Sequence, residues 1–309
     1  MQTAFITHPD CKLHQMQSWH PESPARLAAI EDQLIASGLM PLLSHHDAPL
    51  ATREQLLRVH TPAHLALLEA TSPQEGIINI DLDTGMCPHS LDAAYRAAGA
   101  AVLAVDLLMG KKIGNAFCSV RPPGHHATRN RAMGFCFFNN IAVGAAHAME
   151  EYGLERVAVV DFDVHHGNGT EDIFQEDSYD GRVLMVSTFQ HPLYPYSGTE
   201  GRSSRMVNVP LAEGSGSKVF RAAVSDHWLP ALAAFRPQMM FISAGFDAHR
   251  DDDLAGMNLL EDDYAWVTTQ IKGVADAYAE GRIVSSLEGG YDLGALGRSV
   301  AAHVKVLIS

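Results

Sequence analysis

The stretch VAVVDFDVHHGNG, residues 157–169, decides the fold, because four apolar residues run directly into a polar cluster. Such continuous hydrophobicity is typical of a strand that is buried on both faces of a parallel sheet. Three other segments repeat the pattern: FCSV-RPPGHH (117–126), FISAG-FDAH (241–249) and IVSSL-EGGYD (283–292). The carboxyl ends of parallel strands lie at one edge of an open sheet, where ligands bind. We therefore expect these four polar clusters to converge on one crevice.

Helical patterns alternate with the apolar runs, which predicts an α/β fold. Capping residues and apolar periodicity predict helices from Ser23-Pro24 to about Gly38, after Thr52 (with Gln55 completing a capping box), and at 90–109, 139–152, 218–235, 262–278 and 293–308. Strands are predicted at 116–120, 157–160, 183–187, 239–243 and 283–286. Because no repeat or linker divides the chain, we interpret residues 1–309 as a single domain.

The composition is acidic: 22 Lys plus Arg stand against 36 Asp plus Glu, a formal net charge of −14. Without a cluster of basic residues a nucleic-acid partner is not expected, whereas a cationic peptide or amine would be attracted. The longest apolar stretch, 97–109, contains Asp106 and is shorter than a bilayer span, and the sequence does not open like a signal peptide. We expect a soluble cytoplasmic protein with no membrane partner.

The sequence positions of the cysteines and of most of the 17 histidines do not indicate a chemical role. The four cysteines are scattered without CxxC spacing, which predicts reduced and mostly buried thiols. Cys136, within the apolar GFCFF, is interpreted as a buried thiol and not as a nucleophile. Five histidines are interpreted as surface residues: His14, His20, His45, His46 and His303.

The segment after residue 160 has the pattern of a metal site. Asp161, Asp163 and His165 alternate, so on an extended backbone their side chains share one face. Asp247, which follows another strand, can supply a further ligand. Three protein ligands leave a position for water, as in catalytic zinc sites, and a carboxylate–imidazole set is also compatible with Fe(II).

Two further positions have the residue types that proton transfer requires. His125 and His126 follow Pro122-Pro123-Gly124, a rigid turn that would fix the direction of the imidazoles. Tyr291 follows two glycines, and a phenol there could donate a hydrogen bond to a developing oxyanion. A core tyrosine is an equally good interpretation of Tyr291 from the local sequence alone.

Taken together, RPPGHHA, GFCFFNN, DFDVHHGNG, SAGFDAH and EGGYD, with HPESPARL near the start, resemble the zinc-dependent histone deacetylase family. The spacing is similar to that of class II and bacterial deacetylase-like members, and the match runs from about His20 to the C-terminus. The resemblance implies the arginase–deacetylase fold, a three-layer α/β/α domain with a mostly parallel eight-stranded sheet. It also implies metal-assisted amide hydrolysis.

The resemblance assigns roles to individual residues. Asp163, His165 and Asp247 correspond to the zinc ligands. His126 resembles the general base that later protonates the leaving amine, and His125 resembles its charge-stabilising partner. Asp161 would stand behind His125 and Asn168 behind His126, while Tyr291 would polarise the amide carbonyl. Because a neutral Asn does not favour the imidazolium, we expect His126 to be available as a base at neutral pH.

The family's acyl-lysine channel is matched less uniformly. Gly134-Phe135 resembles one wall, Tyr194 is placed on the opposite wall, and Asp83 resembles the rim aspartate that holds the substrate backbone; a solvated loop acid is the competing interpretation of Asp83. Leu254 stands where specialised acetylpolyamine enzymes carry a glutamate. The family also binds a structural potassium ion, which would match backbone carbonyl groups of Asp161, Asp163 and His165 together with Ser187.

Four functions are candidates for this sequence. Removal of an acyl group from acyl-lysine in proteins or peptides is the first choice, and an acetylpolyamine amidohydrolase is the main alternative, because the acids at 251–253 would favour a cationic substrate. An arginase-like ureohydrolase would need more bridging aspartates where His125 and His126 stand. A non-catalytic acyl-lysine-binding module would be expected to have lost a ligand, the base or the tyrosine. The physiological substrate, the acyl length and any homo-oligomer stay open.

Overall fold

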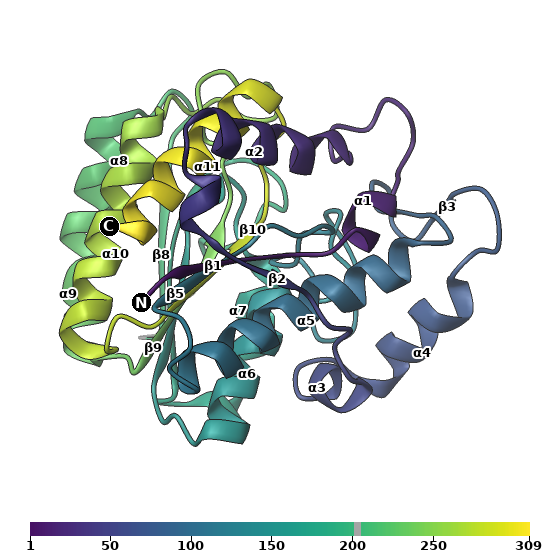
Figure 1. The fold of residues 1–309 in the computed structure, drawn as a ribbon, viewed down its shortest axis with the longest axis horizontal. Helices are drawn as coiled ribbons and strands as arrows, with labels where there is room; N and C mark the ends of the chain where they lie inside the picture. The colour runs from purple at the N-terminus through teal and green to yellow at the C-terminus, as the bar shows by residue number, and fades with distance from the viewer. Residues whose placement is uncertain (201–204) are drawn as a thin grey trace.

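A parallel sheet forms the centre of the computed structural model, which describes residues 1–200 and 205–309 (Figure 1). Its eight strands are β1 (Thr3–Thr7), β2 (Ser44–Asp47), β5 (Asn115–Cys118), β6 (Val157–Asp161), β7 (Val183–Gln190), β8 (Met206–Leu211), β9 (Met239–Ala244) and β10 (Ile283–Leu287). Their order is β2-β1-β5-β10-β9-β6-β7-β8, and every pairing between neighbours in this sheet is parallel. A separate antiparallel pair consists of β3 (Ile78–Asn79) and β4 (Gly85–Met86).

Helices pack on both sides of the sheet (Figure 1). One group contains α2 (Ala25–Ala36), α8 (Ser217–Ala223), α9 (Leu229–Phe235), α10 (Glu261–Tyr278) and α11 (Leu293–Ile308). The other contains α1 (Asp10–Leu13), α3 (Arg53–Leu57), α4 (Pro62–Thr71), α5 (Ser90–Met109), α6 (Asn140–Tyr152) and α7 (Asn168–Phe174). Within the groups α10 packs on α11, α11 on α2, and α5 on α6. The predicted three-layer α/β/α architecture is therefore confirmed.

The predicted strands are the buried ones. All residues of β5, β6, β7, β9 and β10 are buried, as the continuous apolar runs indicated. Three strands of the main sheet were missed, as was the short pair β3 and β4. β2 reads SHHD and alternates between half-buried and exposed residues at one edge of the sheet, and β8 is likewise an edge strand with mixed burial. β1, the third, is only five residues long, although it is largely buried.

The helices begin and end close to the predicted residues. α5 and α11 match the predicted ranges, and Gly153, in the left-handed region at φ 64°, closes α6. Thr52 and Gln55 form the predicted capping box at the start of α3. The predicted helix over 218–235 is continuous but contains a π-turn at Val224–Trp228 between α8 and α9.

Three of the five histidines interpreted as surface residues are buried, which corrects that prediction. His303 bridges Thr268 Oγ1 at 2.6 Å and Ser285 Oγ at 2.9 Å, and burial lowers its pKa to about 3. His14 lies 2.7 Å from Ser90 Oγ, and His20 packs edge-on against Phe135. The sequence around an isolated histidine has no periodicity that indicates burial. The imidazoles can be buried because residues distant in the sequence form hydrogen bonds with them. His45 is exposed and His46 half-buried, and the four cysteines are buried free thiols.

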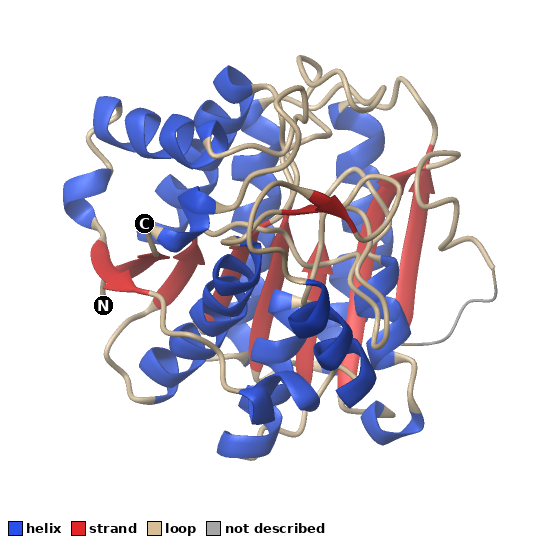
Figure 2. Cartoon of the chain, turned by 90° about the vertical axis from the view of Figure 1, so that its right-hand side faces the viewer, coloured by secondary structure: helices blue, strands red, loops and turns tan. Residues whose placement is uncertain are grey.

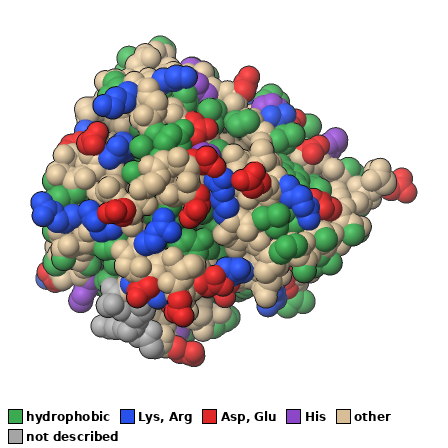
Figure 3. Space-filling view, turned by 90° about the horizontal axis from the view of Figure 1, so that it is seen from below, with side chains coloured by type: hydrophobic (Ala, Val, Ile, Leu, Met, Phe, Trp, Pro, Cys, Tyr) green, Lys and Arg blue, Asp and Glu red, His purple; other side chains and the backbone are tan. Residues whose placement is uncertain are grey.

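The loops of interest gather at the carboxyl ends of the strands. In Figure 2 the arrows of the central strands point toward a side of the molecule that is dense in loops. On the face drawn in Figure 3, basic and acidic side chains are interspersed, with no separation of the two signs over that face. Within the described ranges no helix is long and apolar enough to cross a membrane.

Candidate active site

A cluster of two carboxylates and one imidazole lies where β6 and β9 end. Asp163, His165 and Asp247 each offer one ligand atom, and these atoms lie within 4.8 Å of one another. His165 Nδ1 is 3.0 Å from Asp163 Oδ1 and 3.2 Å from Asp247 Oδ2. Two different loops therefore bring together the three residues that the sequence singled out as ligands.

Asp161 does not join this cluster, which corrects the expectation that it shares a face with Asp163 and His165. β6 ends at Asp161, and the chain then turns: Asp163 N–H donates to Asp161 Oδ1 at 3.1 Å, and His165 N–H donates to Asp163 Oδ1 at 2.9 Å. These local side-chain turns replace the extended backbone on which the alternation argument depended. Asp161 Oδ2 instead faces His125.

The electrostatics of the cluster suit a cation. Burial by itself would lower the pKa of His165, but the hydrogen bonds and charges of Asp163 and Asp247 raise it to about 10. Burial and the charge of Asp163 raise the pKa of Asp247 to about 6. A buried position that holds a proton so strongly between two carboxylates is one where a metal cation would be stabilised. Glycine is required alongside, because a Cβ at Gly245 would collide with Asp163 Oδ2 and one at Gly289 with Asp247 Oδ2.

Two adjacent imidazoles lie beside the cluster, with ring centroids 4.0 Å apart. His125 Nδ1 lies 3.0 Å from Asp161 Oδ2, and His126 Nδ1 lies 2.7 Å from Asn168 Oδ1. An amide oxygen can only accept a hydrogen bond, so His126 carries its proton on Nδ1 when neutral, and its Nε2 is free to take another. The structure thus brings Asp161 and Asn168 behind the two histidines as expected.

The two histidines differ in protonation because their surroundings differ. Burial lowers the pKa of His125, but the charges of Asp163 and Asp161 outweigh it and raise this pKa well above its ordinary value. Burial, together with the positive charges of His125 and His165, holds the pKa of His126 well below its ordinary value. A cationic and a neutral imidazole side by side define an electrostatic group and a base.

Tyr291, which also lines the site, lies in the loop after β10. Burial raises the pKa of its phenol well above the ordinary value, so the hydroxyl stays protonated and can donate a hydrogen bond. The Arg26 guanidinium lies 4.8 Å from the centroid of the Tyr291 ring, and the Phe135 ring meets it edge-on at 5.9 Å.

Sequence reasoning assigned no role to a buried charge network that supports this loop. Arg26 donates from Nε to Gly290 O at 2.6 Å and from Nη2 to Glu288 O at 2.5 Å. Glu22 accepts from both Arg26 and Arg121, and all three side chains are fully buried. Glu22 and Arg26 belong to the HPESPARL motif, so the signal was present, but a buried network between distant segments has no local pattern that reveals it.

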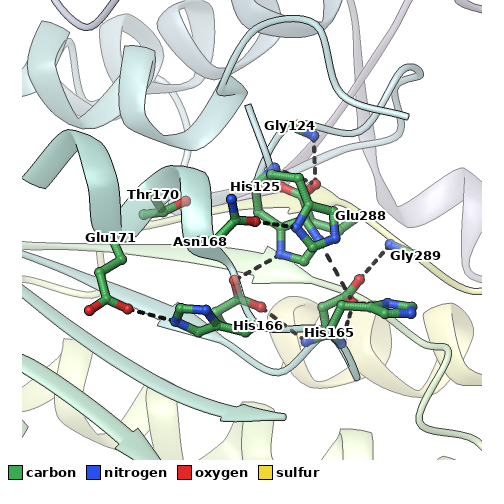
Figure 4. Close-up of polar contacts among 12 residues, drawn as sticks. Gly124, His125, His165, His166, Asn168, Thr170, Glu171, Glu288 and Gly289 are labelled. Carbon is green, nitrogen blue, oxygen red and sulfur yellow. Dashed lines mark hydrogen bonds and ion pairs between the residues drawn. The ribbon is translucent and has the colours of Figure 1, made fainter. Parts of the chain in front are cut away.

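Glu288 is a second supporting residue. It begins the EGGYD motif, but no role for it was predicted from the sequence. Its Oε2 accepts the N–H groups of Gly124 at 2.6 Å and His125 at 3.1 Å (Figure 4). Burial raises its pKa to about 7, against the lowering effect of His125. Glu288 therefore ties the loop that carries the two histidines to the end of β10.

A cavity of about 230 Å³ leads to this centre. Its lining includes His125, His126, His165 and Tyr291 together with the five predicted channel residues, Asp83, Gly134, Phe135, Tyr194 and Leu254. Pro123, Leu193 and Gly289, which were not predicted, complete the lining. Gly134 has φ 55°, and a Cβ there would lie 2.5 Å from His126 Cδ2, so only glycine lets this wall approach the base. The Tyr194 ring lies 5.2 Å from that of His126.

The potassium site implied by the family stays a prediction. Ser187 on β7 is the in-register neighbour of Asp161 on β6, which places it beside the loop that carries Asp163 and His165. Within the described residues its buried hydroxyl has no hydrogen-bond partner.

The comparisons with known proteins identify the family of the chain. Residues 20–307 match the model of the histone deacetylase domain. A histone deacetylase-like amidohydrolase of Pseudomonas aeruginosa is 40% identical over 280 residues, covering 88% of this chain and 72% of that protein. A probable deacetylase of Archaeoglobus fulgidus is 37% identical, covering 95% and 82%. The crystal structure of the HDA15 HD domain superimposes with a TM-score of 0.92 at 34% identity, over 99% of this chain and 88% of that one.

Fold and site together define a hydrolase of the deacetylase and amidohydrolase class. The chain belongs to the histone deacetylase family, whose members are generally metal-dependent. The predicted family and its arginase–deacetylase fold are thereby confirmed.

Proposed function

We propose that the protein is a zinc-dependent lysine deacylase that hydrolyses the amide of acyl-lysine in peptides or proteins. The observation that carries the proposal is the convergence on one narrow cavity of a cation-stabilising triad, two imidazoles of opposite protonation and a neutral phenol. Amide hydrolysis needs a base, a stabiliser of the developing oxyanion and an acid for the leaving amine, and these groups supply all three.

The donor set fits a divalent metal ion. Asp163, His165 and Asp247 would hold zinc, with Fe(II) as the alternative for the same oxygen and nitrogen donors. Oδ2 of Asp247 is buried and faces His165 Nδ1 at 3.2 Å, so these two ligand atoms are placed to share one cation. When bound, zinc would polarise the amide carbonyl and lower the pKa of a water molecule.

The chain's own residues would move the proton and stabilise the charge. His126 Nε2 takes the proton of the attacking water and delivers it to the leaving amine, while Asn168 holds the ring by its Nδ1–H. The Tyr291 hydroxyl donates to the carbonyl oxygen as negative charge develops on it. His125, kept cationic by Asp161, stabilises the charge on the same side as His126.

The rim of the cavity supports a peptide substrate. Apart from Met1, the three most exposed large apolar side chains of the described residues are Leu82 (98%), Trp19 (76%) and Tyr196 (72%). Leu82 adjoins Asp83, Tyr196 lies two residues from Tyr194, and Trp19 packs beside His20, which contacts Phe135. A peptide that follows the acyl-lysine stem across the rim would cover such residues, whereas a small amine would not.

An acetylpolyamine amidohydrolase is the second candidate, favoured by acids close to the cavity. Asp251, Asp252 and Asp253 line a hollow that shares Leu254 and Tyr291 with the main cavity. The exposed carboxylates among them and the net charge of −14 would attract an ammonium group. Leu254, however, presents no charge to a cationic substrate in the cavity.

The test compares an acetyl-lysine peptide with acetylspermidine, using protein that is stripped of metal and reloaded with zinc. We expect peptide hydrolysis that requires zinc and is strongly reduced in His126→Ala and Tyr291→Phe. A strong preference for acetylspermidine would replace the proposal by the second candidate. Zinc binding without turnover of either substrate would contradict the removal of acetyl groups and would indicate a longer acyl group, another small amide or a binding role.

A further inference from the structure

The loop that presents Tyr291 has little rigidity of its own. Gly289 and Gly290 precede the tyrosine, and Gly290 lies at φ 117°, a conformation that other residues rarely adopt. Gly289 N–H donates to Asp163 Oδ2 at 2.8 Å, so the start of the loop is fixed by the metal-type cluster. The backbone of Tyr291 itself must be held by another group, because glycine offers no side chain that could pack.

Asp252 supplies that group. Its Oδ2 accepts the N–H of Tyr291 at 2.6 Å and that of Asp292 at 3.1 Å, and its Oδ1 accepts the N–H of Leu254 at 3.1 Å. The residue is only 4% exposed. One buried carboxylate therefore joins two segments that line the cavity: the loop after β9, which carries Leu254, and the loop after β10, which carries Tyr291.

The hydrogen bonds are placed so that they determine the direction of the phenol. With the amide of Tyr291 held by Asp252, the ring starts from a fixed Cα and lies between the Arg26 guanidinium and the Phe135 ring. Loss of the carboxylate would leave the N–H groups of Leu254, Tyr291 and Asp292 without this acceptor, and the loop would no longer be held in one position.

We propose that Asp252 is a positioning residue, which orients Tyr291 toward the reacting carbonyl and holds Leu254 at the rim. It does not touch the substrate. The inference rests on the proposed role of Tyr291 as the hydrogen-bond donor. It assigns to Asp252, in the acidic segment 251–253, the function of positioning a catalytic group and not that of attracting a cation.

A double-mutant cycle tests the inference with wild type, Asp252→Ala, Tyr291→Phe and the double variant, all loaded with zinc. Misplacing the donor by about 1 Å is expected to cost roughly 10–100-fold in kcat, so Asp252→Ala should lose this much. In the Tyr291→Phe background the same substitution should change kcat less than about 3-fold, because the donor it positions is already gone. Equal losses in both backgrounds would overturn the inference.

Two further variants separate positioning from folding. Asp252→Asn retains one oxygen, which can accept the N–H groups of Tyr291 and Asp292, and it should recover most of kcat; recovery no better than in Asp252→Ala contradicts the inference. Asp263→Ala is the matched control, since Asp263 is a buried carboxylate that accepts from Leu260 N–H and Ser217 Oγ outside the site. It should lower the melting temperature but leave kcat unchanged.

The cycle also distinguishes this inference from the proposed function. If Tyr291→Phe alone retains the wild-type kcat, the proposed role of Tyr291 is wrong and the inference about Asp252 fails with it. If Tyr291→Phe lowers kcat to a small but measurable value and Asp252→Ala costs the same in both backgrounds, only the inference fails. Zinc content, measured by elemental analysis, should equal the wild-type value in every variant.

Discussion

Replacing Asn168 by Asp should move the pH dependence of the reaction toward higher pH. Asn168 Oδ1 accepts the Nδ1–H of His126 at 2.7 Å and carries no charge. An aspartate there would keep the hydrogen bond and add a negative charge that stabilises the imidazolium. The base works only when it is deprotonated, so a higher pKa of His126 means that activity is lost at a higher pH as the pH falls.

The size of the shift follows from the distance. With the new charge centred about 4 Å from the ring and an effective dielectric constant of about 20, the attraction is roughly 4 kcal/mol, which the burial of the carboxylate partly offsets. An opposite charge at this range moves a titration by roughly 1–3 pH units. In the wild type the acid limb should lie below the ordinary histidine pKa of 6.5, because burial and the charge of His125 lower the pKa of His126.

The assay is kcat/KM on an acetyl-lysine peptide between pH 5 and 9, which reports the titration of the free enzyme. Asn115→Asp is the control, since Asn115 is a buried asparagine at the start of β5, at the end of the strand away from the site. Its profile should match that of the wild type. An acid limb in Asn168→Asp that is unchanged, or that moves to lower pH, would refute the assignment of His126 as the base.

Three further predictions follow from the cavity and its support. Gly289→Ala should abolish zinc retention in dialysed protein, because the added Cβ would lie 2.6 Å from Asp163 Oδ2 and collide with Asp247 Oδ2; normal zinc content would contradict the fit of the triad. Leu254→Glu should raise the ratio of kcat/KM for acetylspermidine over the peptide at least roughly 10-fold, since a charge at the cavity wall pairs with the ammonium; an unchanged ratio would place Leu254 outside substrate contact. Arg26→Lys should lower kcat by roughly 10-fold or more with KM nearly constant, because an ammonium cannot donate in the planar fork that reaches both Gly290 O and Glu288 O; wild-type kcat would show that the loop is held without it.

Much of the site could be predicted from the sequence because its residues immediately follow buried strands. Parallel strands bring the residues that follow them to one edge of the sheet, so residues of three motifs line one cavity and Asp247 of the fourth joins His165 beside it. The same reasoning failed for Asp161, because it assumed an extended backbone at the point where the strand had already ended.

The supporting residues could not be found in this way. Glu22 and Arg121 are 99 residues apart, and Arg26 and Gly290 are 264 apart. Neither periodicity nor strand order predicts which distant charges pair in a core, since burial of a charge is decided by the partner that it finds on folding. The three buried histidines were missed for the same reason.

The bond between Arg26 and Gly290 has a consequence for how the protein matures during synthesis. The arginine leaves the ribosome 264 residues before the loop that it holds. Until Gly290 has been made, Arg26 can pair with Glu22 but has no loop to support. Segments made earlier can form strands and helices as they emerge, but the Tyr291 loop can be ordered only after residue 290 has left the ribosome. In a nascent-chain experiment catalytic activity should therefore appear abruptly once this loop has emerged, and not in proportion to chain length.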